Sequence, residues 1–297
     1  MPTPAVDNNE QPQALPPVIE TSHPNGHFYS PVVDPEEALA RAGWLWPAKP
    51  PVLAGIDFND AYHHHVLGSL FPQYFGAYDY PEQGAADEEL IGYYTQNSQF
   101  SWLDGRSLFV LLQAWKPKRL IEIGSGYSTL LAADVNRRFL GGTCQISCIE
   151  PYPRPFLRDP RFGISLIEKK VQDVSLDTYD ALEAGDILFI DSSHVCKTGS
   201  DVNFLYFEVL PRLKQGVLIH VHDIFLPHEY PRKWVIDENR SWNEQYLLRA
   251  LLMDSRAYKV LYGSMYAFSK FPEEVRKALA HPRGLAFGGG SLWIEKQ

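Results

Sequence analysis

From about residue 102 onward, short apolar runs alternate with stretches of helical periodicity. The apolar runs predict strands at 119–124, 145–150, 165–171, 186–192, 216–223, 258–263 and 291–296. The periodic stretches predict helices at 103–115, 128–139, 178–184, 202–213 and 241–254, with Asp104 and Asp201 as N-cap candidates and Ser241 near the last start. The predicted strand at 186–192 contains a continuous apolar run, as expected when both faces of a sheet are covered. The alternation therefore predicts an α/β fold, with a doubly wound, mostly parallel sheet between helices.

The N-terminal third of the chain follows neither pattern. Residues 1–25 are proline-rich and polar, which predicts a disordered or extended arm. Residues 26–100 are aromatic-rich and interrupted by prolines, so we expect an irregular cap with short helices ahead of the α/β domain at 101–297. The run His63–His65 lies in this cap. Three consecutive side chains point in different directions on a helix, which favours a surface run over a metal site.

Composition and charge narrow the class of protein. The chain has 297 residues and a net charge of −9, without a lysine- or arginine-rich run, so we expect no nucleic acid partner. No apolar stretch is long enough to span a bilayer, and the N-terminus lacks a signal pattern, so we expect no membrane partner. The three cysteines, Cys144, Cys148 and Cys196, are too few for a disulfide framework and fit a cytoplasmic protein. The sequence is compatible with a homo-oligomer.

The segment RLIEIGSGYST, residues 119–129, joins a predicted strand to a predicted helix through a glycine turn. Gly124 and Gly126 allow a sharp turn and a close ligand approach, and ligands of open α/β sheets bind at such strand ends. Thr129 replaces the third glycine of a dinucleotide motif, and no Gly-Lys-Ser/Thr follows, so a P-loop is excluded.

Acidic residues follow successive strands. Glu122 can reach a cationic ligand group, and Glu150 can accept both hydroxyls of a ribose. Gln172 and Asp173 follow the third strand, where an adenine amino group would lie.

With IEIGSGYS as its first motif and IEP as its second, the chain resembles the class I S-adenosylmethionine-dependent methyltransferases. The resemblance covers roughly residues 100–297 and implies a Rossmann-like, seven-stranded sheet with an antiparallel last strand. It implies S-adenosylmethionine as cofactor, with Glu122 at the methionine amino end and Glu150 on the ribose. The residues expected to line the cofactor are Gly124, Ser125, Gly126 and Ser128.

A second group of residues follows the fourth and fifth predicted strands, in FIDSSH and HVHD. Adjacent parallel strands bring their carboxyl ends together, so Asp191, His222 and Asp223 could share one divalent cation. Here the chain resembles the metal-dependent small-molecule O-methyltransferases of catechol and macrolide-sugar type. That resemblance implies His194 as the general base, Asp191 at the reaction centre, and a small-molecule or glycan acceptor. His222 replaces the usual oxygen ligand, which shifts the preferred metal from magnesium towards manganese, iron or zinc.

The segment 224–240 is long and aromatic, which favours a lid or substrate wall. Tyr230 and Trp234 could stack on a ring, and Arg232 or Arg240 could meet an anionic group; a structural flap is the alternative. The motifs 190–213 and 288–296 resemble a bacterial subgroup associated with glycosylation and secondary metabolism.

Other functions stay open at this point: a metal-independent O- or N-methyltransferase, a peptide methyltransferase, a nicotinamide-dependent oxidoreductase, and a non-catalytic binding module that retains the fold.

Overall fold

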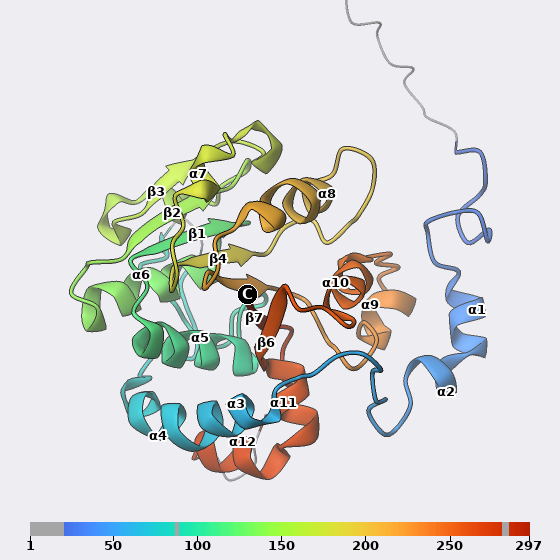
Figure 1. Cartoon of the computed structure of the whole chain (residues 1–297), viewed down its shortest axis with the longest axis horizontal. Coiled ribbons are helices and arrows are strands. Elements are labelled where there is room, and N and C mark those ends of the chain that lie inside the picture. Colours follow the sequence, from blue (N-terminus) through green and yellow to red (C-terminus); the bar gives the residue numbers. More distant parts are fainter. Residues whose placement is uncertain (1–20, 87–88, 281–284) are drawn as a thin grey trace, which may run out of the picture.

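A computed structural model describes residues 21–86, 89–280 and 285–297. Its centre is a seven-stranded sheet with the order β3-β2-β1-β4-β5-β7-β6 (Figure 1). The strands are β1 (Arg119–Ile123), β2 (Gln145–Ile149), β3 (Ser165–Ile167), β4 (Ile187–Ile190), β5 (Leu218–Val221), β6 (Tyr258–Gly263) and β7 (Leu292–Lys296). Strands β1 to β5 pair in parallel, and β7 runs antiparallel to both β5 and β6. The predicted fold class is confirmed, although β3 ends four residues before the predicted strand.

Helices cover both faces of the sheet. The helices α5 (Trp102–Trp115) and α6 (Tyr127–Phe139) lie on one face. The opposite face carries α7 (Asp177–Asp180), α10 (Glu244–Leu252) and a helical segment that begins with α8 (Asp201–Phe204) and continues to Arg212. This is the doubly wound arrangement that the alternation predicted.

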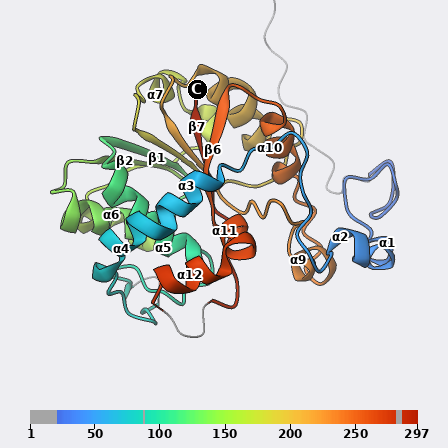
Figure 2. The same ribbon diagram turned by 60° about the horizontal axis from the view of Figure 1, so that its bottom comes forward.

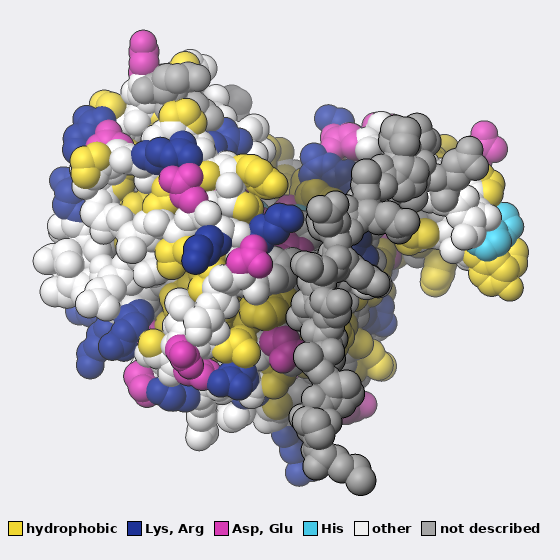
Figure 3. All heavy atoms as spheres, turned by 90° about the horizontal axis from the view of Figure 1, so that it is seen from above, with side chains coloured by type: hydrophobic (Ala, Val, Ile, Leu, Met, Phe, Trp, Pro, Cys, Tyr) yellow, Lys and Arg dark blue, Asp and Glu magenta, His cyan; other side chains and the backbone are white. Residues whose placement is uncertain are grey.

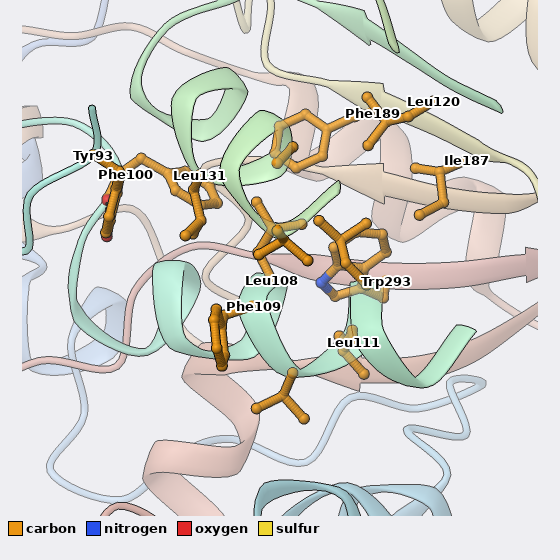
Figure 4. Close-up of a cluster of buried hydrophobic side chains, with 14 of the residues drawn as sticks. Tyr93, Phe100, Leu108, Phe109, Leu111, Leu120, Leu131, Ile187, Phe189 and Trp293 are labelled. Atoms are coloured by element: carbon orange, nitrogen blue, oxygen red, sulfur yellow. The ribbon is translucent and has the colours of Figure 1, made fainter. Parts of the chain in front are cut away.

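Successive residues of each strand enter different cores, because side chains alternate across a sheet. In β4, Ile187 and Phe189 pack with α5 and α6, whereas Leu188 and Ile190 pack with the opposite helices. Figure 4 shows the first core, in which Trp293 and Phe189 meet Leu108 and Leu111 of α5. The two cores hold the strands in one register, and that register fixes where their carboxyl ends lie.

The N-terminal region forms two parts. Residues 21–46 include α1 (Pro35–Ala40) and α2 (Ala42–Leu45) and project from the body beside α9 (Arg232–Ile236) (Figures 1 and 2). The projecting part is attached by Trp46 Nε1, which donates to the Tyr230 carbonyl at 2.8 Å. The projecting part exposes the aromatic side chains of Phe28, Tyr29 and Trp44. Figure 3 shows one face of the molecule, on which positive and negative side chains are interspersed.

The second part packs into the sheet's own core. It contains α3 (Asp60–His65), the helical turn Val66–Leu70 and α4 (Phe71–Tyr74). Val66, Leu67 and Phe71 are buried in the same cluster as α5. The predicted arm at 1–25 lies mostly outside the described residues. Within the described part of the chain, no helix is both long and apolar enough to cross a membrane.

Three local predictions were wrong. Ser101, not Asp104, precedes α5, and the buried Asp104 carboxylate accepts from the main-chain N–H groups of Gly290 and Ser291. Ser200, not Asp201, caps α8 through a hydrogen bond from Asn203 N. His63 is completely buried, where its Nε2 accepts from Gly263 N at 2.9 Å.

In the α/β domain, three helices had no predicted counterpart. One is α9, which lies within the predicted lid segment 224–240. The other two are α11 (Ser264–Lys270) and α12 (Pro272–Ala278), which lie between β6 and β7.

Candidate active site

A cleft of about 620 Å³ lies at the carboxyl ends of β1, β2, β4 and β5. This is where open α/β sheets bind their ligands, and the volume is typical of a small-molecule site. Its walls come from the glycine loop, the ends of β2, β4 and β5, the segment before α5, the segment around α9, and the loop before β7. The predicted residues that line it are Gly124, Ser125, Gly126, Ser128, Glu150, Asp191, His194, His222 and Asp223.

The glycine loop is shaped by contact with the end of β4. Gly124 has a φ of +78°, and a Cβ atom there would lie 1.6 Å from the Asp191 carbonyl oxygen. Only glycine fits this position. Gly126 begins α6, and its N–H donates to Thr129 Oγ1 at 3.0 Å. The buried Ser125 Oγ has no hydrogen-bond partner in the described part of the chain, so the loop offers a hydroxyl at the cleft.

Glu122 lies behind this loop and is not among the residues that line the cleft. Its two carboxylate oxygens accept hydrogen bonds of 2.5 Å from Ser128 Oγ and Thr129 Oγ1. Burial raises the pKa of the Glu122 carboxyl to about 7. In this geometry Glu122 supports the start of α6, and any contact with the methionine end of the cofactor would pass through Ser128 or the loop.

Glu150 faces the cleft at the end of β2. Its carboxylate accepts from Tyr152 N at 2.8 Å and from Ser125 N at 3.3 Å, so it joins the glycine loop to the next loop. Gln172 and Asp173 do not line the cleft; the Gln172 amide donates to the Gly199 carbonyl instead. Their contact with adenine stays a prediction.

A cluster of potential ligands lies at the ends of β4 and β5. One ligand atom each from Asp191, His194 and Asp223 lies within 4.8 Å of the others. His194 Nε2 is 3.3 Å from Asp191 Oδ1 and 3.5 Å from Asp223 Oδ2. The other ring nitrogen, Nδ1, lies 2.9 Å from Glu244 Oε2. His194 is thus enclosed by carboxylates on both sides.

This cluster differs from the predicted metal set, because His194 takes the place expected for His222. His222 Nε2 is 3.7 Å from Asp223 Oδ1, and its buried Nδ1 has no hydrogen-bond partner among the described residues. His220, in the middle of β5, is stacked on Phe189 at 3.7 Å between ring centroids and belongs to the core.

The carboxylates control the charge of His194. Burial by itself would lower the pKa of this imidazole, but the contacts with Asp191 and Glu244 outweigh burial and raise the pKa well above its usual value. Without a metal, the carboxylates therefore favour the imidazolium form of His194, which has no lone pair to accept a proton. This arrangement does not favour the general-base role expected for His194.

Aromatic side chains form the outer wall of the cleft. They are Trp102, Phe225, Trp234, Trp242 and Phe287. Trp242 lies 4.4 Å from the His194 ring, and the Arg240 guanidinium lies over both Trp234 and Trp242, at 4.3 and 4.7 Å. Trp234 and Arg240 thus line the cleft, in the segment that was predicted to form a lid or substrate wall. Tyr230 does not line this wall: it is 2% exposed, and its hydroxyl accepts from Gln245 N.

Three residues that line this cleft have a left-handed backbone conformation. Trp102, His194 and Asp223 have φ values of +49°, +60° and +56°, in the left-handed region. Such conformations are costly for residues other than glycine and cluster at functional sites.

Comparison with known proteins identifies a domain within the chain. Residues 121–224 match the family model described as a methyltransferase domain. An uncharacterized protein from Archaeoglobus fulgidus is 36% identical over 167 residues, which cover 54% of this chain and 73% of that protein.

Similar solved structures share little sequence with the chain. One is described as a methyltransferase from Thermobifida fusca, with 13% identity, coverage of 65% of this chain and 78% of that chain, and a TM-score of 0.43. Another, described as an rRNA-methylase from Clostridium thermocellum, has 11% identity, coverage of 66% and 96%, and a TM-score of 0.38. A third is described as a protein-L-isoaspartate O-methyltransferase from Plasmodium falciparum in complex with S-adenosyl-L-homocysteine. It has 13% identity and a TM-score of 0.29, and the match covers 40% of this chain and 58% of that chain.

The strand order, the glycine loop with Glu150 at the next strand end, and the family match agree with one another. The comparisons therefore identify a methyltransferase domain at residues 121–224, the part of the chain that runs from β1 past the end of β5.

Proposed function

We propose that this chain transfers a methyl group from S-adenosylmethionine to a hydroxyl of a small molecule or sugar, at a centre built from Asp191, His194 and Asp223. The observation that carries the proposal is their convergence within 4.8 Å at the cleft that the glycine loop also lines. Cofactor and acceptor would therefore meet in one cleft.

The same residues fit a divalent metal. Two carboxylates and an imidazole are a common donor set, and the imidazole favours manganese, iron or zinc over magnesium. His194 Nε2 faces the carboxylates, while Nδ1 is engaged by Glu244. A divalent ion bound there would lower the pKa of an acceptor hydroxyl.

The protein's own groups position the reactants. Gly124, Ser125 and Ser128 form the floor on which the cofactor would lie, and Glu150 would accept hydrogen bonds from its ribose. The carboxylates of Asp191 and Asp223 are the proton acceptors nearest to an acceptor hydroxyl at the cluster. Because methyl transfer needs an in-line attack, most of the catalytic effect would come from holding the two reactants.

The aromatic wall supports a ring-shaped acceptor. Trp242 lies beside His194, and Trp102 and Phe287 lie on the same cleft with ring centroids 6.3 Å apart. Aromatic faces bind planar rings and apolar ring surfaces. A catechol-like ring or a sugar would place a hydroxyl at the cluster while its ring contacts these side chains.

Manganese titration of metal-stripped protein tests the proposal. Wild type should bind one ion, His194→Ala should lose that binding, and His222→Asn should keep it. Equal loss in both variants would restore His222 as a ligand. No manganese binding by wild type, together with binding of S-adenosylmethionine, would favour metal-independent O- or N-methyl transfer.

A further inference from the structure

Glu244 is the least accessible acidic side chain near the cleft. It is 0% exposed and begins α10, fifty residues after the histidine it contacts. Its Oε2 is 2.9 Å from His194 Nδ1, and its negative charge helps to raise the pKa of the buried Tyr206 hydroxyl. A completely buried carboxylate is costly unless it is paired, so its contact with His194 calls for an explanation.

The first turn of α10 also holds the backbone around His194. The N–H groups of Asn243 and Glu244 both donate to the His194 carbonyl, at 3.1 and 3.2 Å. The Asn243 side chain accepts from Cys196 N and donates to Cys196 O, at 2.6 and 3.2 Å. These bonds fix residues 194–196 and stabilise the left-handed φ of +60° at His194.

The Glu244 contact determines which nitrogen of His194 is available. A carboxylate at Nδ1 favours a proton on Nδ1, so a cation that replaced the Nε2 proton would be held by Nε2 on the side where Asp191 and Asp223 lie. Carboxylate partners of this kind orient metal-binding histidines and increase their basicity.

We propose that Glu244 is a positioning residue that fixes His194 as an Nε2 ligand for the cation shared with Asp191 and Asp223. This inference rests on the proposed function. It assigns a role to a residue that contacts neither the cation nor the acceptor and that no motif in the sequence marks.

The first test compares manganese affinity by calorimetry, without acceptor. Glu244→Gln should weaken manganese binding about 10- to 100-fold, while affinity for S-adenosylmethionine stays within about twofold of wild type. Glu244→Asp, which keeps the charge, should recover part of the loss. The control is Gln245→Leu: Gln245 is equally buried and bonds to Phe225 N and His228 O, so this variant should lose stability but keep its manganese affinity.

The second test needs no variant. In wild type labelled with ¹⁵N-histidine and loaded with zinc, His194 should show a metal-bound Nε2 and a protonated Nδ1. Zinc on Nδ1, or unchanged manganese affinity in Glu244→Gln, would overturn the inference. If wild type bound no metal at all, the metal centre in the proposed function would fail together with this inference, whereas loss of metal binding only in Glu244→Gln leaves that centre intact.

Discussion

Gly124 and the main-chain carbonyl of Asp191 are in such close contact that the end of β4 directly shapes the glycine loop. A Cβ atom on residue 124 would lie 1.6 Å from the Asp191 oxygen. Since Asp191 also belongs to the cluster with His194 and Asp223, this contact joins the glycine loop to the proposed reaction centre.

Gly124→Ala should therefore damage both sites. The left-handed backbone costs about 1–2 kcal/mol for alanine, and displacing the Asp191 backbone adds roughly 1–3 kcal/mol. The control is Gly141→Ala, at φ +67° with no atom within 4 Å, which should show only the backbone cost. Urea unfolding gives both values, and equal losses would mean that the contact with Asp191 is unimportant.

The buried carboxyl of Glu122 predicts a pH dependence of stability. Its pKa in the folded chain is about 7, above the value in the unfolded chain, so the folded state holds the proton more tightly. The corresponding stability is fully present below about pH 4.5 and is lost as the pH rises towards 7, with a total of roughly 3 kcal/mol.

Glu122→Gln removes this titration. Relative to wild type, the variant should gain stability as the pH is raised from 5 to 8, as measured by urea unfolding at each pH. Glu168→Gln, at an exposed carboxylate whose pKa is lowered by Arg158, is the control and should show no such gain. A pH-independent difference for Glu122→Gln would show that the Glu122 carboxyl is ionised throughout.

Glu150 should contribute to cofactor affinity both through the ribose and through the loop. Glu150→Ala should weaken binding of S-adenosylmethionine by about 1–3 kcal/mol, because it leaves polar groups unpaired. Glu150→Gln keeps one acceptor oxygen and should lose less. Calorimetric titration gives both affinities, and wild-type affinity in Glu150→Ala would remove Glu150 from the cofactor site.

Trp102 lines the cleft at a cost in stability. It has a φ of +49° and a side chain that is 42% exposed, so its conformation is costly and its burial small. Asparagine tolerates the left-handed region, so Trp102→Asn should leave the free energy of unfolding unchanged or raise it by about 1 kcal/mol. Trp44→Asn, at a 75% exposed tryptophan in α2, is the control and should gain nothing. A loss above about 1 kcal/mol in Trp102→Asn would indicate a structural role for the ring.

Much of this architecture follows from local sequence. The strand and helix periods gave the sheet, and the glycine turn with Glu150 marked the cofactor side of the cleft. Asp191, His194 and Asp223 could be expected near one another because they follow adjacent strands.

Other features depend on contacts between distant segments. Nothing in the sequence around Glu244 or Trp242 shows that α10 places them against His194. Asp104 was predicted as a helix cap from its local sequence alone. Its actual partners lie in the loop 288–291, about 185 residues away, so the local sequence does not show them. The cluster contains His194 and not His222, and the backbone of His194 has a left-handed φ of +60° and is hydrogen-bonded to the start of α10.

The most direct test of the account is a calorimetric titration of metal-stripped protein with S-adenosylmethionine, followed by manganese. We predict that the cofactor binds at one site and that manganese then binds at a separate site. The manganese site should be absent in Asp223→Asn, because Asp223, which follows β5, is one of its proposed ligands. Absence of cofactor binding, with or without manganese, would contradict the account.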